Sequence, residues 1–82
     1  MPAPEVGHGA AEESIRLVIA WYSGQIMEQR RAAEPDQLLL GELLEARRVC
    51  VEDQRRLGEA SAEEVAGILA MYAARYRELT ET

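Results

Sequence analysis

Two carboxylates, Glu42 and Glu45, form the pattern in this sequence that most resembles a metal-binding motif. An E-x-x-E pair on a helix places its two side chains on neighbouring positions one turn apart. Carboxylate oxygens are ligands that Mg²⁺ accepts, and a second acidic pair on a facing helix would complete a site for phosphate chemistry. The spacing therefore raises the hypothesis of a magnesium-dependent enzyme with Glu42 and Glu45 as ligands.

The segment Gly41–Leu44 is similar to the start of the first motif of the helical nucleotide pyrophosphohydrolases. That resemblance implies a bound Mg²⁺ held by carboxylates from facing helices. It also implies an E-x-x-D pair on a later helix, and no such pair follows in this sequence. Arg48 is spaced to pair with Glu45, so a solvated face with ion pairs one turn apart explains the same residues. We therefore predict no metal site and no cofactor, and keep the phosphohydrolase as an alternative.

The single histidine and the single cysteine are weak candidates for catalysis. His8 lies between two glycines in the N-terminal segment and has no partner in the sequence to orient it. Cys50 falls on an apolar helical stripe, where a free cysteine behaves as a small hydrophobic residue. One cysteine also excludes an intrachain disulfide, which favours a cytoplasmic protein.

The charge of the chain disfavours nucleic acid as a partner. Nine basic residues, all of them arginine, stand against fifteen acidic ones, which gives a net charge of −6. Binding to a phosphate backbone requires clustered positive charge, and acidic residues lie close to each arginine doublet. The alternative of a nucleic-acid-binding regulator would rely on Arg30 and Arg31 at the end of the first helix. The apolar run Leu17–Tyr22 is too short to cross a membrane, and no other apolar run in the sequence is long enough.

Periodicity and capping signals predict an all-α protein with helices at about 10–31, 35–57 and 62–79 after a flexible tail over 1–9. Pro35 suits the first position of the second helix. Ser61 and Glu64 form the S-x-x-E pattern of a capping box at the start of the third. Short loops make neighbouring helices antiparallel, so residues 10–82 are expected to form one three-helix bundle.

Folding the two hairpins predicts which apolar side chains form the core. The expected layers are Ile26 with Leu40 and Leu79, Tyr22 with Leu43 and Tyr76, Ile19 with Ala46 and Tyr72, and Ile15 with Cys50 and Ile68. Leu39 and Leu57 continue the apolar stripe of the second helix. At this spacing, aromatic residues are more typical of a core than of a ligand pocket.

Some apolar residues are left over once this core is assigned. Leu17 and Trp21 lie at the edge of an apolar arc about 200° wide, twice the stripe that is usual for a surface helix. The third helix has small residues and a methionine on its outer side. The predicted partner-binding residues are Leu17, Trp21, Gly67, Ala70, Met71 and Ala74.

Three explanations of this surplus remain open from the sequence. The first is a homodimer in which the first helices pack through Leu17 and Trp21. The second is a different helical protein that covers the same residues, and the third is a steep helix crossing that places Trp21 in the core. We predict a small, non-catalytic interaction or regulatory protein that acts by helix–helix docking.

Overall fold

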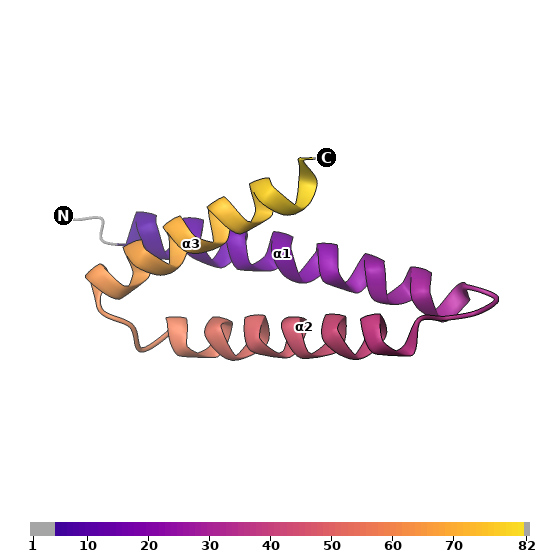
Figure 1. Cartoon of the computed structure of the whole chain (residues 1–82). Helices are drawn as coiled ribbons and strands as arrows, with labels where there is room; N and C mark the ends of the chain where they lie inside the picture. The colour runs from indigo at the N-terminus through magenta and orange to yellow at the C-terminus, as the bar shows by residue number, and fades with distance from the viewer. Residues whose placement is uncertain (1–4, 82) are drawn as a thin grey trace.

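The protein consists of three α-helices joined by two short loops, as a computed structural model that describes residues 5–81 shows (Figure 1). The helices are α1 (Glu5–Arg31), α2 (Gln37–Leu57) and α3 (Ala62–Thr80). Within the described residues every regular element is helical, which confirms the predicted all-α class. None of these helices is long and apolar enough to span a membrane.

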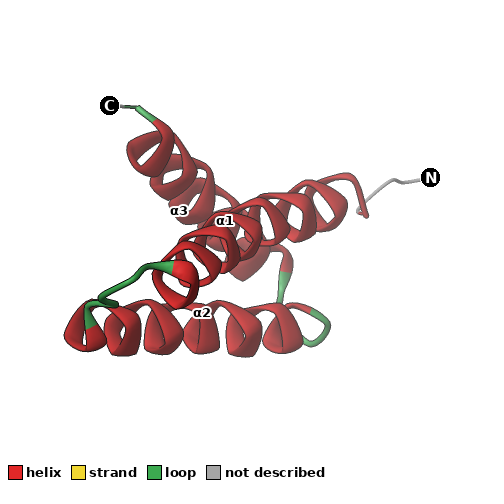
Figure 2. Ribbon diagram, turned by 90° about the vertical axis from the view of Figure 1, so that its right-hand side faces the viewer, coloured by secondary structure: helices red, strands yellow, loops and turns green. Residues whose placement is uncertain are grey.

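Helix α1 is the central element of the bundle. Its principal contacts are with α2, which runs antiparallel to it, and with α3, which crosses it (Figures 1 and 2). Helix α3 diverges from α1 toward its C-terminus, so the arrangement is more open than a parallel stack of three helices. The extents of the molecule are 55 × 25 × 15 Å and its radius of gyration is 14.6 Å. A compact chain of this length would have a radius of gyration of about 12 Å.

The first helix begins earlier than the sequence predicts. Residues 5–9, which we expected in a flexible tail, belong to α1, and residues 1–4 lie outside the described part of the chain. Packing explains the difference, because a Cβ atom built on Gly7 would lie 3.9 Å from Cγ1 of Val65. The backbone of α1 at Gly7 therefore lies close to α3, and Ala11 one turn later is buried in the core, so packing favours a helix here despite the low helix propensity of glycine.

The first loop also differs from the prediction at Pro35. Asp36 is the N-cap of α2, and its side chain accepts a hydrogen bond from the backbone N–H of Leu39 at 3.1 Å. Pro35 therefore precedes the cap instead of occupying the first helical position. The Asp36 carboxylate provides an acceptor for an N–H group of the first turn that has no partner within the helix. A proline in the first turn would only have removed one such N–H group. The Gln29 side chain accepts a further hydrogen bond from the Asp36 N–H at 2.9 Å, which ties the loop to α1.

The start of α3 confirms the predicted capping box. The Ser61 hydroxyl accepts from the N–H of Glu64 at 3.2 Å, and the Glu64 carboxylate accepts from the N–H of Ser61 at 2.8 Å. Two N–H groups that lack helical partners are thereby satisfied.

Substitution of Ser61 by alanine is expected to lower the free energy of unfolding by about 1 kcal/mol, because one cap hydrogen bond is lost. Urea unfolding followed by far-UV circular dichroism measures this loss. Ser61→Asp is the matched control, since aspartate is also a good N-cap, and it should stay close to wild type. Equal losses in both variants would show that the cap does not stabilise α3.

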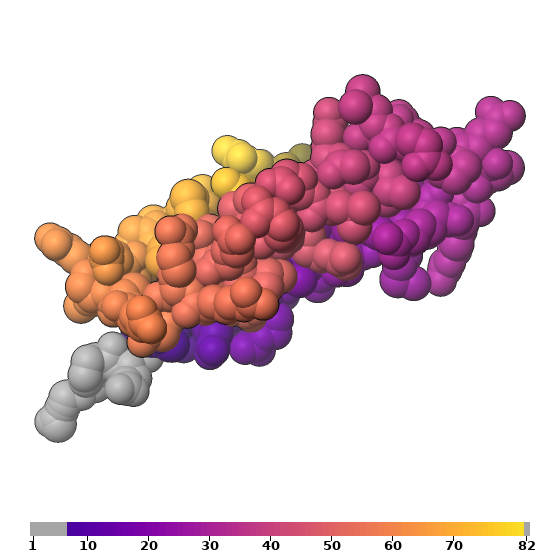
Figure 3. Space-filling view, turned by 90° about the horizontal axis from the view of Figure 1, so that it is seen from below, coloured from indigo at the N-terminus to yellow at the C-terminus, as the bar shows by residue number. Residues whose placement is uncertain are grey.

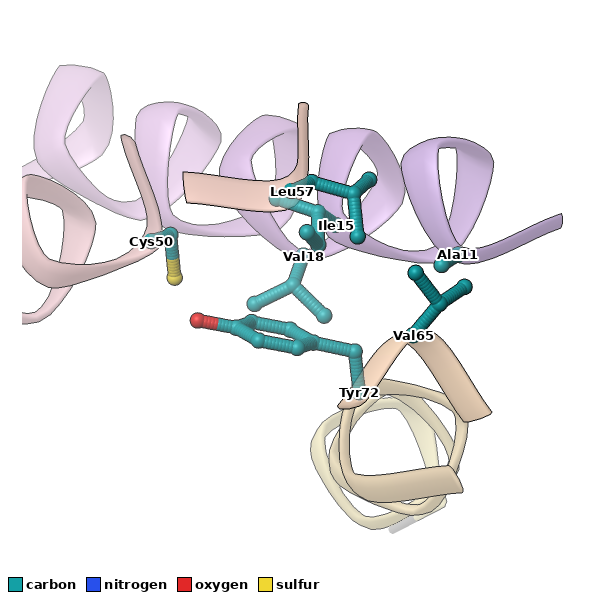
Figure 4. Packing of buried hydrophobic residues seen from close by; sticks show 7 residues of the cluster. All are labelled: Ala11, Ile15, Val18, Cys50, Leu57, Val65 and Tyr72. Carbon is teal, nitrogen blue, oxygen red and sulfur yellow. The ribbon is translucent and has the colours of Figure 1, made fainter. Parts of the chain in front are cut away.

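The core lies around the crossing of α1 with α3 and the C-terminal half of α2. The buried cluster consists of Ala11, Ile15, Val18, Cys50, Leu57, Val65 and Tyr72 (Figure 4). Partly buried Ile19, Tyr22, Ile68, Tyr76 and Leu79 pack against it, in agreement with most of the predicted core positions. Leu39 differs, because 37% of its surface is exposed. It belongs to the N-terminal part of α2, at the end of the molecule that α3 leaves open (Figure 1).

Candidate functional site: the groove between α2 and α3

A groove of about 770 Å³ lies between the C-terminal half of α2 and the first turns of α3. Its lining residues are Val49, Asp53, Arg56, Glu59, Ala60, Glu64, Gly67, Ile68, Met71 and Arg75, and we call it the α2–α3 groove. It exists because both helices pack on α1 while α3 crosses away from it (Figure 2). In the space-filling view α2 runs along the near face of the molecule, with α3 on one side and α1 on the other (Figure 3).

Two apolar residues that line the groove are exposed. Val49 keeps 38% and Met71 44% of its surface accessible. Between them, Gly67 leaves open space, because a Cβ atom placed on it would meet nothing within 4 Å. Methionine adapts its shape to a partner more readily than branched residues do. The groove therefore offers a continuous apolar seat with one flexible side chain in it.

A buried polar contact joins the two walls beneath this seat. The phenol O–H of Tyr72 on α3 donates to Oδ2 of Asp53 on α2 at 2.5 Å. The Tyr72 side chain is fully buried, extends past Val18 and points its hydroxyl toward Cys50 (Figure 4). Arg56 donates to the other carboxylate oxygen, Oδ1, at 2.7 Å. This network fixes the spacing of α2 and α3, because a buried charge without its partners would be costly.

Burial and hydrogen bonding together set the pKa values of Asp53 and Tyr72. Burial alone would raise the pKa of Asp53, but the hydrogen bonds from Tyr72 and Arg56 outweigh it and hold that pKa below its ordinary value of 3.8. Burial, followed by the neighbouring Asp53 carboxylate, raises the pKa of Tyr72 well above its ordinary value of 10.0. Asp53 is therefore ionised and Tyr72 neutral at physiological pH.

The rim of the groove carries both signs of charge. Arg75 lies over the ring of Tyr72, with the guanidinium carbon 5.3 Å from the ring centroid, a cation–π geometry. Arg56 is largely exposed beyond its ion pair with Asp53. Glu59 and Glu64 lie at the end of the groove where the α2–α3 loop turns. The groove thus has an apolar floor and a rim of mixed charge.

The structure separates the six predicted partner-binding residues. Gly67 and Met71 line the groove, while Ala70 is exposed and Ala74 half-buried elsewhere on α3. Leu17 and Trp21 belong to α1 and lie outside the lining of the groove. Leu17 is 37% exposed, and half-buried Trp21 packs edge-to-face on Tyr22, with ring centroids 5.4 Å apart.

The acidic pair that suggested metal binding lies away from this groove. Glu45 is engaged by Arg48, which donates to both of its carboxylate oxygens, and this hydrogen bonding lowers the pKa of Glu45. Glu42 and Glu45 line a shallow hollow on α2 together with Leu38, an exposed leucine. Among residues 5–81, no group of three or more His, Cys, Asp or Glu side chains is placed to hold a metal ion.

Other sequence candidates are dispersed. Arg30 and Arg31 are exposed in the last turn of α1, at the opposite end of the molecule from the α2–α3 loop (Figure 1). His8 is half-buried near the start of α1, and Cys50 is buried as predicted. The Asp53–Tyr72 contact was not predicted from the sequence. The signal was present, since position 53 continues the three-and-four spacing of Leu43, Ala46, Cys50 and Leu57.

The fold and the groove define this chain as a small three-helix protein with an open interhelical seat. Comparison with protein-family models, with curated proteins and with solved structures finds no match for it. Its function is therefore inferred from the geometry of its own residues.

Proposed function

We propose that this protein is a small, non-catalytic interaction protein that binds a helix in the α2–α3 groove. The observation that supports this proposal best is the exposed apolar seat formed by Val49, Gly67 and Met71 where α2 and α3 diverge. A helix in a groove is a recurrent mode of recognition, in which apolar anchors enter the groove and polar residues surround them. A groove of this kind needs no catalytic residue to function.

The hydrogen bond at the base of the groove supports the same proposal. The Asp53–Tyr72 hydrogen bond joins the two walls, so the seat is formed before a partner arrives. Preorganisation of this kind lowers the entropic cost of binding. Arg56 and Arg75 at the rim are of a residue type that is enriched at binding hot spots, and their charges would set the direction of the bound helix.

The predicted role of Leu17 and Trp21 remains a second, separate prediction. These residues belong to α1, so they would form a contact of their own and not part of the groove. We give the groove priority because it is concave and its walls are fixed by a buried network, whereas Leu17 is a single exposed side chain.

Site-specific photo-crosslinking in the native host cell tests the proposed function. A benzophenone amino acid at position 71 places the reactive group in the groove, and the same amino acid at position 24 is the control. Gly24 belongs to α1 and is exposed, with open space around its Cα. We expect an adduct of defined mass from position 71 only.

A second variant tests whether formation of the adduct requires an open groove. Adding Gly67→Gln to the position-71 variant fills the seat, and we expect the adduct to disappear. A position-71 variant that gives no adduct, or the same adducts as position 24, contradicts the proposed function.

A further inference from the structure

We propose that the helix bound in the α2–α3 groove is α3 of a second copy of this chain, so that two chains pair through antiparallel α3 helices about a two-fold axis. This inference rests on the proposed function and names the partner. In such a pair each groove receives the α3 helix of the other chain, so both seats are filled by one symmetric contact.

The charge pattern along the groove side of α3 is self-complementary. Glu64 lies in the first turn and Arg75 eleven residues later, and both line the groove. An antiparallel pair centred midway between them places each Glu64 opposite Arg75 of the second copy. The same register places each Ile68 opposite Met71, so apolar side chains meet between the two ion pairs. A parallel pair would instead bring equal charges together.

The lining of the groove as a whole agrees with a partner of mixed charge. Two arginines, Arg56 and Arg75, and three acidic residues, Asp53, Glu59 and Glu64, line the groove. A helix of uniform charge would face like charges at one end of the seat. The α3 helix itself has an acidic first turn, Glu63 and Glu64, and basic residues later, Arg75 and Arg77. Lying antiparallel to α3 of the first copy, it would place its basic residues near Glu59 and Glu64 and its acidic first turn near Arg75.

The net charge of the chain does not prevent this association. Each copy carries −6, and like net charges repel. At physiological ionic strength the Debye length is about 8 Å, and charges farther apart than this are largely screened. Screening therefore weakens the repulsion between distant charges more than the attraction between close ion pairs at the groove.

The shape of the single chain also favours pairing. The molecule is only 15 Å across in its thinnest dimension, and its radius of gyration exceeds that of a compact chain. Helices α2 and α3 of the two copies would together form a four-helix arrangement with a shared apolar interior. Association is a common source of stability for chains too short to build a large core.

Absolute mass by light scattering after size exclusion, on the full chain, tests the inference. We expect wild type to have twice the chain mass of 9.1 kDa at millimolar concentration and to dissociate on dilution. Gly67→Gln should weaken pairing about a hundredfold, because two extra side chains enter one interface. Gly24→Gln is the matched control on α1 and should pair like wild type. Both positions have open space for a side chain, so both variants should stay folded.

A charge exchange tests the antiparallel register. Arg75→Glu and Glu64→Arg should each weaken self-association about tenfold, since each brings like charges together at both ends. An equimolar mixture of the two should pair again, because positions 64 and 75 are both acidic in the first variant and both basic in the second. Glu64→Gln keeps the capping box of α3 and serves as the folding control, with far-UV circular dichroism as the readout.

Failure of the inference is separable from failure of the proposed function. A wild-type chain that stays monomeric at millimolar concentration, or a charge-exchanged mixture that does not pair, overturns the inference. If the position-71 crosslink then yields a groove-dependent adduct with a different protein, the proposed function stands and the partner is not a second copy. An adduct of two copies of this chain supports both.

Discussion

Replacing Tyr72 with phenylalanine is expected to lower the free energy of unfolding by about 1.5–3 kcal/mol, the range for a hydrogen bond to a charged group. The ring stays in place, so no cavity forms, and only the donor to Asp53 Oδ2 is lost. Arg56 still holds the other oxygen of the carboxylate. Urea unfolding at neutral pH, with wild type and variant measured at the same low concentration, gives the difference. A loss below about 0.5 kcal/mol, the size of an ordinary surface substitution, would contradict a structural role for this contact.

The pH dependence of that difference identifies Asp53 as the partner. The pKa of Asp53 is lowered by folding, so its contribution to stability is complete above its ordinary value of 3.8. The contribution is lost as the pH falls through the lower pKa of the folded state, because protonation abolishes the charged acceptor. The stability difference between wild type and Tyr72→Phe should therefore shrink below pH 3.8. A difference that stays constant over this range would mean that Asp53 is not the group that Tyr72 stabilises.

At alkaline pH, stability is expected to fall as the pH rises, which is opposite to the trend at acid pH. The pKa of Tyr72 is raised by folding, so wild type should lose stability as the pH rises above 10.0, the ordinary value for tyrosine. The unfolded chain releases this proton more readily than the folded one, which favours unfolding. Phenylalanine has no such proton, and the variant should lack this component of the loss.

The number of helices and the start of α3 could be predicted from local signals. A capping box depends on residues three positions apart, and apolar periodicity depends on a few turns of helix. Both are properties of short segments, so they do not depend on how the helices pack in the tertiary structure. The N-terminal boundary of α1 is different, since Gly7 and Gly9 disfavour a helix while Val65, close to Gly7, belongs to another helix that no local signal brings there.

The groove and the buried network could not be derived from the same signals. The sequence shows a polar residue at position 53 within an apolar spacing, but not that Tyr72 comes from another helix to satisfy it. That pairing depends on how α3 crosses α1, which no local pattern specifies. The same crossing angle decides that Met71 and Val49 stay exposed and that Leu39 is only partly covered. The surplus of apolar residues was visible in the sequence, whereas the concave surface that Met71 helps to form was not.

Truncation of Ile15 to alanine is expected to cost about 2–5 kcal/mol, the range for a fully buried aliphatic residue. Ile15 has no exposed surface and belongs to the cluster that joins all three helices. A core of this size supplies only about 3–5 kcal/mol in total, so the substitution should remove a large part of the stability, as urea unfolding at about 25 °C would measure. Leu38→Ala is the matched control, since 76% of the Leu38 side chain is exposed, and its cost should stay below about 0.5 kcal/mol.

A more conservative substitution of Ile15 tests whether α2 and α3 unfold together because both pack on α1. Ile15→Val removes one methylene and should cost about 0.5–1.5 kcal/mol, which leaves a folded protein to measure. Both α2 and α3 pack mainly on α1, so unfolding of this variant should remain a single transition. The fluorescence of Trp21 on α1 and the circular dichroism of all three helices should therefore change together. If α3 unfolds first, the two probes will separate, and the core would have to consist of the α1–α2 hairpin alone, with α3 as an independent unit.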